Sequence, residues 1–211
     1  MTVILDDADL LPHPTRRDAV VRAWTQLVGP GPVLSADERR AVIGWARAAW
    51  AGATAPDEQG GPAAEAAHWL AADAGGITAE VVDDLEARGL DRLRYLEIVG
   101  IVGRLANIDF YARGLGASLP AVPDEAHPSP EPTGQVAPER ERRGFVPSIA
   151  ALRAPFVLDA LPGEGEELRA MHEPMYLPMT AIGDFTFGDV LTRPQIEYLA
   201  SRASYLNECF Y

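Results

Sequence analysis

The sequence predicts an all-α protein. Alanine, leucine, arginine and glutamate dominate the chain, whereas alternating β-branched segments are rare. Several segments begin with a helix-capping residue, end at glycine or proline, and repeat their apolar residues at helical spacing. With 47% hydrophobic residues in 211, the chain can bury one sizeable core, or one domain and part of another.

Two helices are expected within the first fifty residues. Thr15 can cap a helix that runs to about Val28 and stops at the Gly-Pro-Gly-Pro segment 29–32. Ser35 and Glu38, three residues apart, have the spacing of a capping box, in which each side chain bonds to the other residue's backbone N–H. They predict a second helix over 37–51.

Three further helices are expected before residue 119. One covers 63–72, and a second begins after Thr78 and ends near Gly89. Asp91 caps the longest, over 92–114, whose apolar residues cover more than half of its circumference. A helix that is apolar on so many sides belongs at the centre of a bundle or at a subunit interface.

The segment 120–147 has a different composition, with seven prolines and few large apolar residues. Such a composition is typical of an extended strap or linker. We therefore expect an N-terminal helical half over 1–119, a strap over 120–150 and a C-terminal part over 151–211.

A last helix is predicted from residue 193, because Thr192 and Gln195 form another capping-box pair. The segments Leu34–Glu38 and Leu191–Gln195 share the pattern Leu-[Ser/Thr]-x-x-[Glu/Gln], which indicates a weak internal repeat. In this register the first copy lacks the reactive residues of the second and is a degenerate, structural half. The second copy lacks the helices that follow the first, so a truncated second repeat is expected.

Cys209 is the only cysteine of the sequence, and it lies in Asn207–Tyr211, the front of a Cys-x-x-Cys motif. A redox pair needs a second sulfur or selenium three residues later, at position 212. A TGA codon is read either as stop or as selenocysteine. We therefore expect that the frame was cut at such a codon, which the nucleotide sequence after Tyr211 can test.

Glu197 lies twelve residues before Cys209. On one straight helix this spacing is about 18 Å, too long for direct proton transfer. The two residues can cooperate only if the helix ends and the chain turns, for which Asn207 is a suitable left-handed C-cap. A second helix starting near Cys209 would then favour the thiolate.

The pattern Glu197-x11-Cys209-x-x resembles the motif of the alkylhydroperoxidase D (AhpD)-like and carboxymuconolactone decarboxylase-like superfamily. The resemblance covers most of 34–119 and 191–211 and is specific at the C-terminal motif. It implies an AhpD-like helical bundle that is a homo-oligomer when full length and reduces hydroperoxides with a dithiol reductant. Cys209 matches the resolving thiol, Glu197 the acidic residue of the proton relay, and position 212 the attacking cysteine or selenocysteine of an antioxidant selenoprotein.

The chain departs from this family pattern, because the attacking atom and the relay histidine have no counterparts in it. As it stands we expect an inactive peroxidase. Two alternatives stay open: a decarboxylase-like lyase that does not use Cys209, and a non-catalytic helical module that binds a partner.

Composition and charge narrow the kinds of partner, cofactor and cellular location to be expected. A net charge of −13 argues against nucleic-acid and anionic-membrane partners. The N-terminus lacks the features of a signal peptide, no apolar run reaches membrane-spanning length, and one cysteine cannot form an internal disulfide. We therefore expect a cytoplasmic protein. No cofactor motif or metal-ligand spacing is present in the sequence.

Overall fold

The computed structural model of the chain describes residues 4–56, 60–124, 129–138, 141–143, 145–149, 158–188 and 190–207. Contacts divide the chain into two compact units, Met1–Met171 and His172–Tyr211, which we describe separately. The division predicted from sequence, with boundaries at 119 and 150, remains a prediction.

The predicted all-α class is confirmed. The first unit contains α1 (Pro14–Leu27), α2 (Ala36–Trp50), α3 (Gly61–Ala72), α4 (Ala79–Ala87), α5 (Arg92–Gly114) and most of α6 (Pro162–Met175). A short 3₁₀ helix, η2 (Ala74–Gly76), connects α3 to α4. The second unit contains the end of α6, a 3₁₀ helix η3 (Met179–Ala181) and α7 (Arg193–Leu206).

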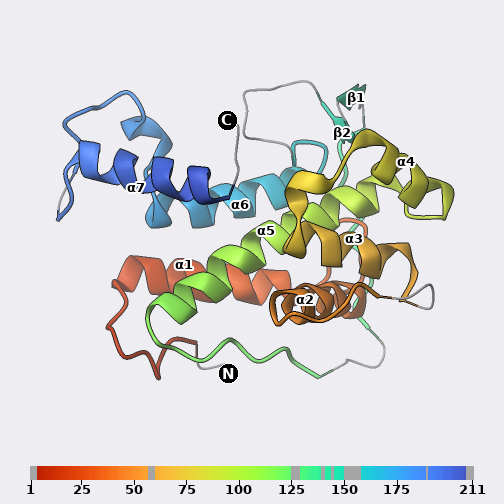
Figure 1. The fold of residues 1–211 in the computed structure, drawn as a ribbon, viewed down its shortest axis with the longest axis horizontal. Coiled ribbons are helices and arrows are strands. Elements are labelled where there is room, and N and C mark those ends of the chain that lie inside the picture. The colour runs from red at the N-terminus through yellow and green to blue at the C-terminus, as the bar shows by residue number, and fades with distance from the viewer. Residues whose placement is uncertain are drawn as a thin grey trace. The chain divides into compact units, whose positions relative to one another are not determined.

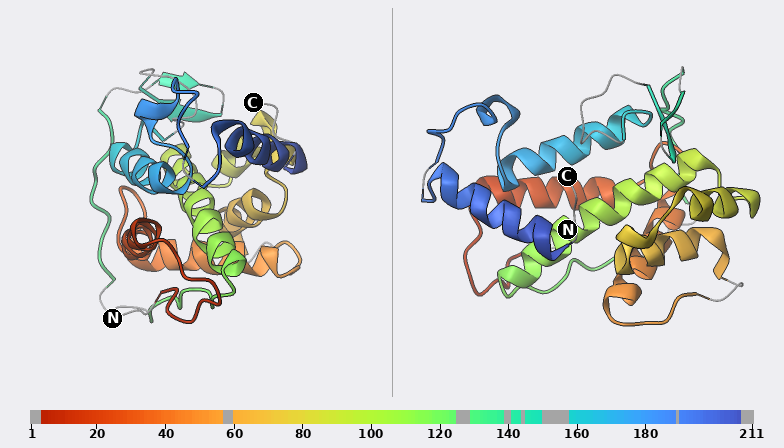
Figure 2. Two further views of the ribbon diagram at one scale, coloured as in Figure 1. Left: turned by 90° about the vertical axis from the view of Figure 1, so that its left-hand side faces the viewer. Right: turned by 45° about the horizontal axis from the view of Figure 1, so that its top comes forward.

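Helix α5 is the centre of the first unit. It packs against α1, α2 and α3 and runs between them in Figures 1 and 2. Its start agrees with the prediction, since the Asp91 carboxylate accepts hydrogen bonds from the backbone N–H of Leu93 at 2.8 Å and of Arg94 at 3.4 Å. Of the two positions expected for this helix, the structure of the first unit shows the one at the centre of a bundle.

The capping residues explain where the other helices begin. At α2 the Ser35 hydroxyl accepts from the Glu38 N–H at 3.3 Å, and the Glu38 carboxylate accepts from the Ser35 N–H at 2.8 Å, which confirms the capping box. The Gln195 side chain likewise accepts from the Thr192 N–H at 2.9 Å at the start of α7. Thr15 is not a cap: α1 begins at Pro14, which is pre-organised for the first helical position, after His13.

The core of the first unit is formed by apolar side chains from the inner faces of these helices and from the segments that precede α2 and α6. Its largest fully buried apolar members are Trp24, Leu27, Leu34, Ile43, Leu96, Ile98, Ile101, Leu105, Ile108 and Leu158. The same interior also holds charged side chains without exposed surface, namely Arg39, Glu97, Arg104, Asp109 and Glu164. Buried charges on this scale were not predicted from sequence.

Two short strands lie after the proline-rich segment and were also not predicted. β1 (Glu141–Arg143) pairs antiparallel with β2 (Val146–Ser148), with Glu141 opposite Ser148 and Arg143 opposite Val146. The described parts of 120–138 contain no helix or strand, as expected for a strap. The backbone of this strap is tied to the start of α2, because the Ala36 N–H donates to the Pro130 carbonyl at 3.1 Å.

Candidate functional site

The predicted site residue Glu197 lies on α7 in the second unit, and its carboxylate is held by two partners. Arg193, one helical turn earlier, donates from Nε to Oε1 at 2.6 Å. The Tyr176 hydroxyl, directly after α6, donates to Oε2 at 3.1 Å. The carboxylate therefore connects α7 to the end of α6 and has a defined orientation.

Arg193 is the organising residue of this site. Its guanidinium is almost fully buried and donates to the carbonyl oxygens of Ala181 at 2.8 Å, Asp184 at 2.9 Å and Ile182 at 3.0 Å. It also lies over the Phe185 ring, 5.6 Å from the centroid. The planar fork of donors thus fixes the turn before α7 and Glu197 at the same time.

The charges of the site follow from these contacts. The hydrogen bond from Arg193 lowers the pKa of Glu197, and the bond from Tyr176 acts in the same direction. Burial and the neighbouring Glu197 carboxylate raise the pKa of Tyr176. At neutral pH the site therefore consists of an ionised carboxylate, a protonated phenol and a cation.

Cys209 lies outside the described residues, so its geometry relative to Glu197 stays a prediction. The first part of the condition, that the helix ends before Cys209, agrees with the end of α7 at Leu206, whereas the turn of the chain after Asn207 stays a prediction. The proposed left-handed conformation of Asn207 is wrong: its φ is −98° and its ψ is 12°. Asn207 instead stays close to helical geometry, and its side-chain amide donates to the Ala203 carbonyl at 2.8 Å.

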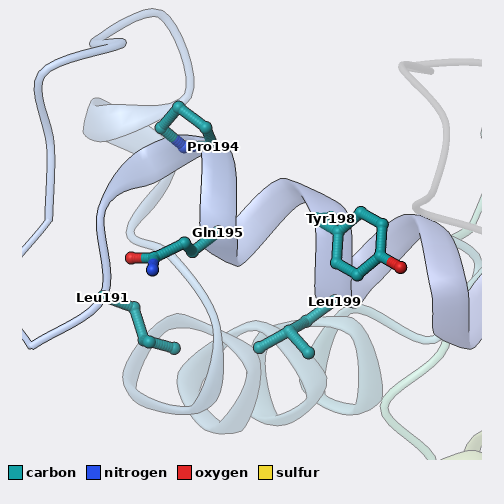
Figure 3. Close-up of a pocket in the computed structure, with 5 residues that line it drawn as sticks. All are labelled: Leu191, Pro194, Gln195, Tyr198 and Leu199. Atoms are coloured by element: carbon teal, nitrogen blue, oxygen red, sulfur yellow. The ribbon is translucent and has the colours of Figure 1, made fainter.

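An open apolar groove of about 370 Å³ lies along the start of α7 (Figure 3). Leu191, Pro194, Gln195, Tyr198 and Leu199 line it. Further along the same helix, Tyr205 and Leu206 are also mainly exposed. Glu197 does not line the groove, so the apolar surface and the carboxylate are separate features of α7.

Sequence reasoning identified Glu197 but missed Arg193 and Tyr176. Arg193 could have been found, because an arginine four residues before a glutamate on a helix is a standard ion-pair spacing. Tyr176 had no such signal, since its approach depends on how the chain turns between α6 and α7.

Among the described residues, no group of three or more His, Cys, Asp or Glu side chains could hold a metal ion. Within the same residues no helix is both long and apolar enough to cross a bilayer.

Comparisons with protein-family models, with curated proteins and with solved structures found no match to this chain. A function must therefore be argued from the residues themselves.

Proposed function

We propose that α7 and the residues after it belong to a thiol- or selenol-dependent peroxidase of the AhpD-like class. The observation that supports this most is the oriented Glu197 carboxylate, placed twelve residues before the single cysteine on a helix that ends between them. In this proposal Glu197 and Tyr176 form the acidic side of a proton relay, and Cys209 is the resolving thiol.

The proposed reaction consumes one hydroperoxide and one dithiol. A thiolate or selenolate at position 212 attacks the peroxide, the O–O bond breaks, and the alcohol leaves with a proton. Cys209 then attacks the resulting sulfenic or selenenic acid, which releases water and forms a bond between residues 209 and 212. The external dithiol reduces this bond and is itself oxidised to a disulfide.

The test uses the protein made when the codon after Tyr211 is decoded as cysteine or selenocysteine and translation continues. This product should reduce an organic hydroperoxide with dithiothreitol as donor, and Cys209→Ser should abolish turnover. Glu197→Gln should lower turnover about 100-fold, in the range of a lost general acid–base group. Glu173→Gln, on the neighbouring helix, is the matched control and should leave it unchanged. Hydroperoxide turnover that is equal in the Cys209→Ser variant would contradict the role proposed for Cys209, whereas decarboxylation of a small acidic ring compound that is indifferent to alkylation of Cys209 would favour the lyase alternative.

A second candidate function is a non-catalytic helical module, which the exposed face of α7 favours. When Ser35 is aligned with Thr192, Val42, Ala46 and Ala49 of α2 correspond to Leu199, Ala203 and Leu206 of α7. In α2 these positions are buried, and the helix packs against α3 and α5. In α7 Leu199 and Leu206 are more than half exposed.

From this alignment of α2 with α7 we infer that the partner of α7 is an apolar helix. Leu199→Glu should then abolish binding of such a helix, whereas Ser201→Glu, at another exposed position of α7, should not. Size-exclusion chromatography and a thermal melt separate the two functions. A module that folds to bind a partner should melt cooperatively by itself, whereas a chain that lacks part of its own fold should aggregate through this face.

A further inference from the structure

A fully buried carboxylate lies at the point where the chain returns to the core after the strap. Glu164, in the first turn of α6, has no exposed surface. Its Oε1 accepts hydrogen bonds from Arg39 Nη1 and from Gln26 Nε2, each at 3.0 Å. Its Oε2 accepts from Arg104 Nη2. The donors come from three different helices, α2, α1 and α5.

These donors are held in place by contacts that do not involve Glu164. Arg39 donates from Nε to the Leu27 carbonyl at 3.1 Å and from Nη1 to the Glu97 carboxylate. Arg104 donates from Nε to the Gly100 carbonyl at 3.3 Å. The Gln26 carbonyl oxygen accepts from both guanidinium groups. The three helices therefore present a pre-organised set of donors that converges on one carboxylate.

The net positive charge of Arg39, Arg104 and Glu97 together also requires an anion at the position of the Glu164 carboxylate. Arg39 and Arg104 supply two positive charges in the interior, and Glu97 supplies one negative charge. The second oxygen of Glu97 is occupied by the N–H groups of Val33, at 2.8 Å, and Leu34, at 3.1 Å. Without Glu164 the interior would hold one uncompensated positive charge, which is strongly unfavourable.

The residues around Glu164 fit the same face of α5. Leu158, Ala160 and Leu161 pack in one apolar cluster with Leu96. Gly100 makes room for this segment, because a Cβ there would stand 3.2 Å from Leu158 Cδ1 and 3.5 Å from Glu164 Oε2. Apolar contacts therefore position the segment 158–164 on α5. The Glu164 carboxylate adds a requirement for a negatively charged group, which apolar contacts alone do not impose.

We propose that α1, α2 and α5 form a carboxylate-binding site whose resident ligand is the Glu164 side chain, so that residues 158–171 dock on the core as a carboxylate-specific latch. The site is distinct from the one around Glu197 and does not depend on the peroxidase proposal. It predicts that a small free carboxylate binds when the resident carboxylate is removed.

The experiment is a chemical rescue of Glu164→Ala, followed by thermal unfolding. This variant should melt about 10 °C below the wild type, because it leaves a buried positive charge unpaired. Acetate or formate should raise its melting temperature by about 3–5 °C in a saturable manner. Acetamide, which has the shape of acetate but no charge, should not.

Two control variants test whether the rescue by acetate is specific to the site of the Glu164 carboxylate. Glu166→Ala, an exposed neighbour on the same turn, should melt like the wild type and show no response to acetate beyond that of the wild type. Glu164→Ala combined with Arg104→Met should also lose the response. Equal stabilisation of all variants by acetate, or equal rescue by acetamide, would overturn the proposal.

If Glu164→Ala does not fold, Glu164→Gln provides the second test, since it keeps the shape and removes the charge. Amide hydrogen exchange over 158–171 should then be at least tenfold faster than in the wild type, while exchange within α2 changes less. Unchanged protection of 158–171 in this variant would show that docking does not require the carboxylate.

Discussion

The carboxylate of Glu164 and the guanidinium of Arg104 are paired inside the first unit, and neither side chain has any exposed surface. Together with Arg39 and Glu97 they form a neutral set of two cations and two anions. Such sets add little net stability compared with a well-packed apolar core, but the loss of a single member is costly. The charged set therefore makes the packing of α6 depend on the pairing of Glu164 with Arg39 and Arg104.

The first prediction concerns acid stability. Burial alone would raise the pKa of Glu164, but Arg104 and Arg39 outweigh it and hold the pKa below its ordinary value. As pH falls through the ordinary glutamate range, the unfolded chain therefore binds a proton before the folded chain does, and the free energy of unfolding decreases. Burial raises the pKa of Glu97. As pH falls, protonation of Glu97 therefore increases the free energy of unfolding and partly offsets the effect of Glu164.

Glu164→Gln should consequently be less stable at pH 7 by about 1–3 kcal/mol and should lose less stability below pH 4.5 than the wild type does. Urea unfolding between pH 3 and 7 measures both effects. An acid limb that is as steep in the variant as in the wild type would show that other carboxylates dominate it.

The second prediction concerns Gly31, which lies against the same charged set. A Cβ at this position would stand 1.8 Å from Glu97 Oε1 and 2.1 Å from Arg39 Nη1. Gly31→Ala should therefore displace the buried pair and lower the free energy of unfolding by about 3 kcal/mol.

Gly103→Ala is the matched control, because no atom lies within 4 Å of a Cβ at this exposed position of α5. It should stabilise the protein by about 0.5–1 kcal/mol through helix propensity. Chemical denaturation measures the free energy of unfolding of both variants. Similar free energies of unfolding for Gly31→Ala and Gly103→Ala would contradict the tight contact at Gly31.

The third prediction concerns Arg193. Arg193→Lys keeps the positive charge but cannot bind three carbonyl oxygens and the Glu197 carboxylate together. The pKa of Glu197 should therefore rise towards its ordinary value, and amides in 181–184 should exchange faster. A carboxyl-carbon NMR titration measures the pKa, and Arg202→Lys, elsewhere on α7, is the control that should leave it unchanged.

The fourth prediction concerns the ion pair between α2 and α5. Arg47 donates to both oxygens of the buried Asp109, at 2.7 and 2.8 Å, and also to the Pro120 carbonyl at 2.9 Å. Asp109→Asn should lower the free energy of unfolding by about 2 kcal/mol, because one charge-assisted bond is replaced by a poor contact. Asp84→Asn is the control: it removes an exposed partner of Arg88 and should change the free energy of unfolding by less than about 0.5 kcal/mol.

The sequence allowed α1 to α5 and α7 to be predicted because their signals are local. The bounds of α5 follow from the cap at Asp91 and from its continuous apolar pattern, and the capping box at Ser35 and Glu38 forms within a single turn. The β1–β2 pair was missed because strands of three residues carry almost no periodic signal.

The buried charges could not be placed in the same way, because their pairing joins residues far apart in the chain. Arg39, Glu97 and Glu164 are each ordinary surface residues by type, and only the fold brings them together. One sign was available: Glu97 and Arg104 are two helical turns apart, so they lie on the same face of a helix that is apolar on most of its circumference. Of the described residues of the candidate site, only Glu197 was predicted, although the four-residue spacing of Arg193 from it was also visible in the sequence.

The requirement for balanced charge in the interior also constrains how this sequence can diverge. A lineage that replaces one of Arg39, Glu97, Arg104 or Glu164 loses stability unless it also replaces a second of them or converts the whole set to apolar residues. These four positions should therefore co-vary in distant homologues. A search for an arginine in the second helix, Glu-x6-Arg in the long one and a glutamate after the proline-rich segment offers a way to find relatives whose overall identity is too low to detect.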